Sequence, residues 1–200
     1  MPERNTATKQ RILAAAAELF AENGYHGTGM GDLERAVNLG RGALYYHIGN
    51  KEALLYEISI SLVEEMVTFA EELVAGPLGA EEKLRLLAHR LMRLINDRQS
   101  EITVFYREWT WLTGERRQHV LEARDRFEAA CEALLEDGTR SGAFAERPSP
   151  VLVKGILGLF NYSYLWFRSS GPMTYDAVAD AFVDLILHGI APPQADQAGA

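Results

Sequence analysis

Side chains that can bind an anion lie close together in the stretch GRGALYYHIGNKEALL, residues 40–55. Arg41 and Lys51 carry cations, and Tyr45, Tyr46 and His47 lie between them. Guanidinium and ammonium groups pair with phosphate oxygens, and phenol and imidazole groups can hydrogen-bond to the same oxygens. The stretch therefore has the chemistry of a surface that touches a polyanion. Its residues also fit a plain alternative, in which a short helix runs into a turn and a longer helix.

The overall charge of the chain counts against a polyanion partner without deciding the question. The 200 residues carry a net charge of −8. Residues 1–56 hold equal numbers of basic and acidic side chains, so residues 57–200 carry the whole excess. An acidic body repels nucleic acid and acidic membranes. A neutral N-terminal part can still contact phosphates if its cations face one way.

Patterns for catalysis or metal binding are missing from the sequence. The histidines are scattered, with no pair at the spacing that metal ligands use. No nucleophile motif, phosphate-binding loop or dinucleotide fingerprint occurs. Glu101 and Glu108 fall near one helical face and are interpreted as solvated carboxylates. We therefore predict a protein that is not an enzyme, with no catalytic residue, no metal and no cofactor.

Compartment signals point to the cytoplasm. Cys131 is the single cysteine, so no intrachain disulfide can form, which fits a reducing compartment. The first ten residues, MPERNTATKQ, contain no apolar signal core. The least charged stretch, residues 151–167, is shorter than the roughly 20 apolar residues that a membrane span needs. The sequence predicts a cytoplasmic location and no membrane partner.

Helical periodicity runs through almost the whole chain, and no stretch alternates as a strand does. Asn5 or Thr6 can cap a first helix that Gly24 ends, Asn50 can cap a long helix, and Thr174 can cap the last one. We predict an all-α fold of about nine helices. The expected bounds of the others are residues 30–37, 41–47, 81–98, 102–112, 115–139 and 149 to about 171.

The first quarter of the chain resembles the N-terminal domain of TetR-family transcriptional regulators. The residues that match are RILAAAAELFAENGYHGTGMGDL, followed by GRGALYYHIGNKEALL. This resemblance implies a three-helix, helix-turn-helix DNA-binding domain over residues 1–49, with the turn at Asn38. A larger C-terminal domain for ligand binding and dimerisation would span residues 50–191. Residues 192–200 are expected to be a disordered tail.

The resemblance also implies which side chains meet DNA. The recognition helix would lie in the major groove, with Arg41 at base edges, where a guanidinium can pair bidentately with guanine. Tyr45 would contact the backbone or a thymine methyl, and Lys51 would meet a phosphate beside the N-terminus of the long helix. The full set of implied DNA-binding residues is Thr28, Arg41, Gly42, Ala43, Tyr45, Tyr46, His47 and Lys51.

Some positions depart from the family pattern. Gly40 replaces the usual small hydroxyl residue before the recognition helix, so this cap lacks a side-chain acceptor. Gly29 and Gly31 stand where many members have a hydroxyl and a basic or polar residue, and Ile48 replaces the common aromatic residue. The second helix therefore offers fewer DNA contacts than usual. We expect either modest affinity per half-site or greater reliance on Arg41, Lys51 and the N-terminal Arg4 and Lys9, which are expected to be disordered.

Dimerisation is expected at the last two long helices. The helix expected over residues 151–167 is apolar on all sides. Such a helix needs two partners, its own core and a second subunit. The resemblance implies a homodimer built through a four-helix interface; a central helix of a monomer is the alternative. The predicted interface residues are Val151, Gly155, Gly158, Tyr162, Trp166, Phe182, Leu185 and Ile186.

Aromatic residues are dense in the same C-terminal part and can line an apolar pocket with a few polar tips. The alternative is an aromatic core without a pocket. The stretch YLWFRSSGPMT resembles one found in family members that sense acyl-CoA, but the helix before it carries few cations for a polyanionic coenzyme. A hydrophobic or aromatic ligand is therefore preferred, with acyl-CoA second. The predicted pocket residues are Phe105, Trp109, Leu112, Phe127, Phe160 and Tyr164.

The function implied is a ligand-responsive repressor on a palindromic operator in double-stranded DNA. A small-molecule inducer would move the long helix after Asn50 and change the separation of the two recognition helices. A helical small-molecule carrier or an enzyme without DNA binding is the alternative.

Overall fold

The computed structural model describes residues 2–188, with side chains from Thr6 onward, and this part of the chain is all α-helical apart from turns. The predicted tail at 192–200 lies outside the described residues. The predicted all-α architecture is confirmed. The helices are α1 (Pro2–Asn23), α2 (Met30–Val37), α3 (Arg41–Ile48), α4 (Lys51–Ala75), α5 (Ala80–Asp97), α6 (Gln99–Glu108), the 3-10 helix η1 (Trp109–Trp111), α7 (Gly114–Arg140), α8 (Ser149–Ser163) and α9 (Tyr175–His188).

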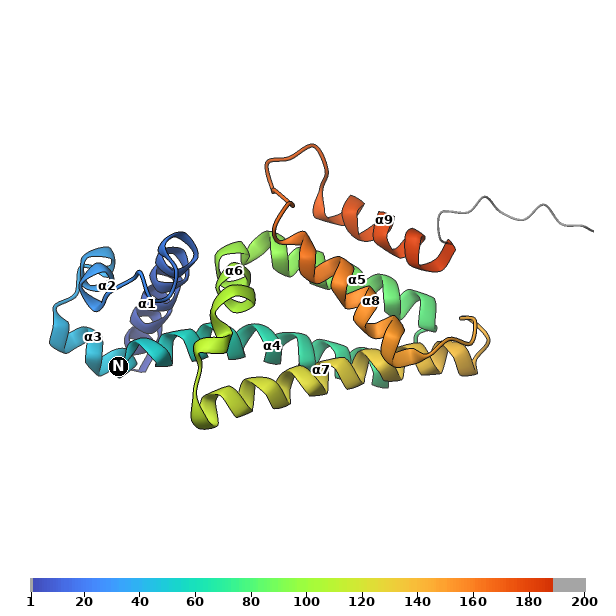
Figure 1. Cartoon of the computed structure of the whole chain (residues 1–200), viewed down its shortest axis with the longest axis horizontal. Helices are drawn as coiled ribbons and strands as arrows, with labels where there is room; N and C mark the ends of the chain where they lie inside the picture. Colours follow the sequence, from blue (N-terminus) through green and yellow to red (C-terminus); the bar gives the residue numbers. More distant parts are fainter. Residues whose placement is uncertain (1, 189–200) are drawn as a thin grey trace, which may run out of the picture.

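The first three helices form a small unit at one end of the molecule (Figure 1). Its centre holds Ile12, Phe20, Leu33 and Leu44, each no more than 1 % exposed. Gly24 ends α1 with a φ of 77°, a left-handed conformation that glycine adopts without a steric penalty. The core is small, and α1 also packs on α4 and α6, so the unit leans on the larger body.

The long helix α4 joins this unit to the rest of the chain. Its N-cap is Asn50, whose side-chain oxygen accepts a hydrogen bond from the Ala53 N–H at 2.8 Å, as predicted. Figure 1 shows α4 and α7 side by side along the length of the molecule. Helix α9 packs mainly on α5, on the side away from α4, and α8 crosses α5 and packs on α7 (Figure 1).

Three predicted helix bounds are wrong. The first helix begins at Pro2, so neither Asn5 nor Thr6 starts it. The sixth helix ends at Glu108, where the chain tightens into η1 through a hydrogen bond from the Leu112 N–H to the Trp109 carbonyl. The eighth ends at Ser163, because the residues after it close consecutive turns on Tyr162 and Ser163. Aromatic residues expected to continue these two helices therefore lie in turns.

Candidate DNA interface and ligand cavity

Helix α3 has an apolar face that points into the core and an outer face that carries polar and aromatic side chains. Leu44 and Ile48 are buried in the core of the small unit, at 0 % and 7 % exposure. Tyr46 is 79 % exposed, and the guanidinium of Arg41 lies 5.7 Å from the ring centre of Tyr45. The predicted contact residues Arg41, Gly42, Ala43, Tyr45 and Tyr46 are all exposed, and His47 is half-buried.

The turn before α3 sets the direction of this outward face. Asn38 adopts a left-handed conformation, with φ of 51° and ψ of 49°, as the sequence predicts for this turn. Gly40 precedes α3 in an extended conformation and supplies no side-chain cap, also as predicted. Ile48 replaces an aromatic residue of the family pattern, and the structure uses it as a core residue. The two short helices thus form a helix-turn-helix pair.

The predicted phosphate contact of the Thr28 side chain is corrected by the structure. Thr28 is 1 % exposed. Its hydroxyl lies 3.1 Å from the Leu19 carbonyl and 3.1 Å from the Gly24 carbonyl and donates to these inward acceptors. The hydroxyl closes the end of α1 and does not face solvent.

The Lys51 side chain also forms hydrogen bonds inside the protein, although it is only half-buried. Its ammonium group donates to the carbonyls of Tyr25 and Thr28 at 2.8 and 2.9 Å and lies 4.4 Å from the ring centre of Tyr25. Burial lowers the pKa of Lys51 below its ordinary value. The side chain therefore fastens the start of α4 to the turn after α1, a structural role that the sequence did not indicate.

A second set of bonds joins the start of α4 to the larger domain. The Glu52 carboxylate accepts from both the N–H and the hydroxyl of Thr113, each at 2.9 Å, and from Arg116 at 3.2 Å. Burial alone would raise the pKa of Glu52, but the bonds from Thr113 and the charge of Arg116 outweigh it and hold the pKa below its ordinary value. Close by, Trp111 of η1 meets His26 edge to face, with ring centres 4.3 Å apart. The segment from η1 to α7 thus holds the DNA-side end of α4.

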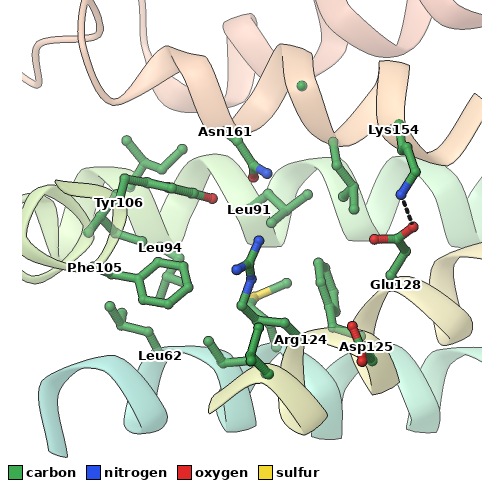
Figure 2. Close-up of a pocket in the computed structure, with 18 residues that line it drawn as sticks. Leu62, Leu91, Leu94, Phe105, Tyr106, Arg124, Asp125, Glu128, Lys154 and Asn161 are labelled. Atoms are coloured by element: carbon green, nitrogen blue, oxygen red, sulfur yellow. Dashed lines mark hydrogen bonds and ion pairs between the residues drawn. The ribbon is translucent and has the colours of Figure 1, made fainter. Parts of the chain in front are cut away.

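The larger domain contains a cavity of about 390 Å³ that is lined by α4, α5, α6, α7 and α8 and is open to solvent on one side, where Arg124, Asp125 and Lys154 are exposed. Its wall is mostly apolar, with leucines from four of these helices and Phe105 and Phe127 from α6 and α7. Figure 2 shows Arg124 extending from α7 toward the space below Asn161, with the Tyr106 hydroxyl directed to the same region. Lys154 of α8 and Glu128 of α7 form an ion pair of 2.5 Å on another side of the cavity. Burial raises the pKa of Tyr106, which keeps its hydroxyl protonated.

Two of the six predicted pocket residues, Phe105 and Phe127, line this cavity. The others are corrections. Leu112 and Phe160 are 1 % exposed and belong to the packed core. Tyr164 stacks on Tyr106 at 5.1 Å, behind the wall, and Trp109 lies in η1 beneath Arg124. The sequence-based set omits Tyr106, although this residue belongs to the same aromatic cluster. It also omits the polar members Arg124, Asp125, Glu128, Lys154 and Asn161, because aromatic density was the only signal used for the pocket.

The outer faces of α8 and α9 carry exposed apolar side chains in the described part of the chain. Val151 is 69 % exposed, Tyr162 65 %, Trp166 46 % and Leu185 38 %. A Cβ atom added at Gly155 or Gly158 would meet nothing within 4 Å, so the backbone at these positions is open to close approach. Phe182 and Ile186 are half-buried beside them, and Phe182 packs edge to face on Phe160. Exposed apolar side chains of this kind are typical of a protein interface.

Two protein-family models together match most of the chain. The model of bacterial regulatory proteins of the tetR family matches residues 12–58, and the model of the tetracyclin repressor-like C-terminal domain matches residues 77–190. The chain belongs to the TetR family of transcriptional regulators.

Individual TetR-family relatives match over nearly full length. The repressor KstR2 of Rhodococcus jostii is 27 % identical over 187 residues, which cover 92 % of each chain. The crystal structure of the TetR-family regulator PfmR from Thermus thermophilus has a TM-score of 0.85 and 34 % identity, over 91 % of this chain and all of that one. AibR, solved in complex with isovaleryl coenzyme A and operator DNA, has a TM-score of 0.81 and 25 % identity, over 90 % of this chain and 98 % of AibR.

As a TetR-family member, the chain is a ligand-responsive, DNA-binding transcriptional repressor that acts as a homodimer. The helix-turn-helix unit supplies the DNA-binding part, and the domain with the cavity supplies the ligand-binding part. Within residues 2–188, no helix combines the length and the apolar character that crossing a bilayer requires.

Proposed function

We propose that this regulator is released from a palindromic operator when an apolar acyl compound enters the cavity of its C-terminal domain. The single observation that carries this proposal is the mixed lining of the cavity: apolar walls around a few polar side chains that include Arg124 and Lys154. Its volume of about 390 Å³ lies within the range of small-molecule sites. Such a lining suits a ligand with an apolar body and one polar or anionic end.

Among the ligand classes, the geometry favours acyl-CoA over a purely hydrophobic molecule. From the sequence, acyl-CoA ranks second because α8 contributes few cations. Lys154 of α8 is paired with Glu128, but the fold also brings Arg124 of α7 to the cavity, so the lining holds a cation that α8 alone does not supply. The relative AibR, solved with isovaleryl coenzyme A, supports the same class.

We infer that the cavity binds and does not catalyse. The residues that line it include no serine, cysteine or histidine, the side chains that most often act as nucleophile or general base. The one close charged pair in the lining, Lys154 with Glu128, neutralises itself. Because the target is chromosomal DNA, we place the protein in the cytoplasm.

At the DNA end, the proposed contacts are those of α3 and of Lys51 at the start of α4. Arg41 would meet base edges, Tyr45, Tyr46 and His47 would meet the backbone, and Gly42 and Ala43 would allow close approach. Lys51 has two of its three N–H donors engaged inside the protein, so one is left to reach a phosphate. Its larger contribution would be to hold the unit in place.

The release experiment uses a labelled duplex selected from a random pool on the purified protein. Fluorescence anisotropy would follow the bound fraction while decanoyl-CoA, coenzyme A or decanol is added. We expect a salt-sensitive complex that decanoyl-CoA dissociates and coenzyme A alone does not. A complex that no acyl compound dissociates would overturn the proposed inducer class. Failure to select any duplex would overturn the DNA-binding interpretation of α3.

The proposed dimer surface has a separate test at Tyr162. Its ring is 65 % exposed on α8 in the single chain, and a partner subunit would bury it. Tyr162→Glu places a charge there, so we expect dissociation to protomers at micromolar concentration, measured by sedimentation velocity. Tyr162→Phe keeps the apolar ring and should stay dimeric. A dimer that tolerates the glutamate would move the interface away from this face.

A further inference from the structure

Arg124 differs from the other cation that lines the cavity, because it has no carboxylate partner among the described residues. It lines the space beside Asn161 and Tyr106, and its guanidinium lies 4.5 Å from the ring centre of Trp109. Within the described residues no ion pair or hydrogen bond from another side chain engages it. Lys154, the other cation of the lining, is already paired with Glu128. Arg124 is therefore the cation that is free to bind an incoming anion.

Trp109 connects Arg124 with the DNA-binding unit. It opens η1, in which Trp111 packs against His26 of the turn after α1. Thr113, the second residue after η1, donates two hydrogen bonds to Glu52 at the start of α4. A displacement of η1 would thus reach the DNA-binding unit at two places. Arg117 also lies near Trp109, at 5.6 Å, so one arginine would remain on the ring if Arg124 left it.

We propose that Arg124 recognises the anionic head of an apolar ligand and signals its presence to the DNA-binding unit through Trp109. This inference rests on the proposed function and assigns the residues that perform it. A cation over an indole ring at an accessible site is held weakly. A bidentate bond to a carboxylate or phosphate is stronger and directional, so a ligand anion draws the guanidinium away from Trp109.

The consequence of that movement follows from the contacts of η1. Without Arg124, Trp109 loses one of its contacts with α7. The populations of the conformations of residues 109–113 then change. That segment holds Glu52 and His26, so the orientation of the DNA-binding unit relative to α4 changes with it. Linkage makes the effect reciprocal: bound operator must weaken ligand binding by the same factor.

Two sources share the required chemistry, a free carboxylate on an apolar chain and a phosphate-bearing acyl-CoA. Tyr106 and Asn161 offer hydrogen-bonding groups to the oxygens of the anion in either one, whether it is a carboxylate or a phosphate. Asp125 also lines the cavity, next to Arg124 in the chain, and disfavours an anion placed on its own side. The head group is therefore expected on the Asn161 side of Arg124.

The first test measures binding by isothermal titration with decanoate, decanoyl-CoA and uncharged decanol. Arg124→Ala should weaken the binding of the anionic probes by about ten-fold or more and leave decanol unchanged. Arg124→Lys should restore part of that loss. Arg107→Ala removes the same charge from an exposed position on α6 and should behave as wild type. Whichever anionic probe depends on Arg124 identifies the source.

Equal loss of binding for decanol and the anionic probes on Arg124→Ala would overturn the head-group assignment, because Arg124 would then act only as part of the wall. No loss for either anionic probe would overturn it as well. Both results leave the proposed function standing if decanoyl-CoA still dissociates the operator. Conversely, the titration needs no DNA, so it tests Arg124 even if no ligand releases the operator.

The second test separates ligand binding from signalling. Trp109→Leu should bind the anionic probe that depends on Arg124 but require about ten-fold more of it to dissociate the selected duplex. Trp109→Phe keeps a weaker aromatic face and should fall between this variant and wild type, which also guards against misfolding of the leucine variant. If both variants release DNA as wild type does, the path through Trp109 is wrong.

Discussion

The DNA-binding unit and the cavity domain assemble their functional surfaces in opposite ways. The proposed DNA face is the outer side of one short helix, α3, and its residues are neighbours in the sequence. The cavity takes its lining from five helices, from Leu62 on α4 to Asn161 on α8. The first surface depends on local structure, and the second depends on how distant segments pack.

The two regions also differ in packing. Phe20 lies at 1 % exposure in the centre of the N-terminal unit, with Tyr25 edge to face on it. Phe127 faces the cavity of about 390 Å³ on one side. A well-packed centre fixes the shape of the DNA face, whereas an open wall can adapt to a ligand. This contrast predicts that comparable substitutions have unequal effects in the two regions.

The largest expected effect is that of Phe20→Ala, which should lower the free energy of unfolding by about 3–5 kcal/mol. Phe127→Ala should cost clearly less, because its ring already faces open space and loses fewer contacts. Urea denaturation followed by circular dichroism measures both. Equal losses would show that the cavity wall is as tightly packed as the N-terminal core. The prediction assumes one cooperative transition, which the coincidence of two spectroscopic probes checks.

The local character of the N-terminal unit explains how much of it the sequence predicts. The bounds of α2, the left-handed Asn38 and the Asn50 cap are all short-range features, and the structure confirms them. Thr28 and Lys51 were assigned to phosphates from the resemblance, yet both side chains form contacts inside the protein. Those contacts join residues distant in sequence, such as Lys51 and Tyr25, and no local pattern encodes them.

The C-terminal domain is predictable as an architecture and less so as a site. Periodicity predicts its helices, but Trp109 falls in a 3-10 turn and Tyr164 beyond the end of α8, because aromatic residues fit a helix and a turn equally well. Arg124 lines the cavity and is also exposed, so nothing in the sequence distinguishes it from the other solvated residues of this charged helix. Its position beside Asn161 follows only from the packing of α7 against α8.

A smaller effect, confined to DNA recognition, is expected for Arg41→Ala. If Arg41 pairs with guanine, the substitution should cost about 1–3 kcal/mol on the preferred duplex and relax the preference at one base pair. Competition between duplexes that differ at single positions measures this. The fold should be unaffected, because Arg41 is exposed and contacts Tyr45 only loosely. A uniform loss on all duplexes would assign Arg41 to the phosphate backbone.

Lys51→Ala distinguishes a phosphate contact from a structural one and should weaken operator binding by about ten-fold. Removal of a phosphate contact lowers the slope of log affinity against log salt by about 1. Removal of a residue that only fastens the turn after α1 leaves that slope unchanged, and the bonds to Tyr25 and Thr28 favour this result. Lys9→Ala is a matched comparison, because Lys9 also joins the N-terminal unit to α4, through an ion pair of 2.8 Å with Glu57, and its salt slope tests the expected N-terminal DNA contact in the same way. A full change of slope for Lys51→Ala would show that its remaining N–H binds DNA.

The smallest expected effect lies in the outer layer, where His89 of α5 bridges Asp176 and Asp180 of α9 at 2.8 Å each. Burial lowers the pKa of His89, but the bonds to the two carboxylates outweigh it and raise the pKa above its ordinary value. A raised pKa in the folded state means that the bridge stabilises fully below the unfolded pKa and is lost as pH rises through the folded pKa. His89→Gln should therefore reduce stability by less than about 1 kcal/mol at about pH 5.5, and by nearly nothing at about pH 8.5. Thermal denaturation at the two pH values measures the difference. A larger loss of stability at the higher pH would mean that the neutral imidazole holds α9 to α5. The attachment of α9 would then depend on hydrogen-bond geometry, as contacts in the N-terminal unit do, and not on charge.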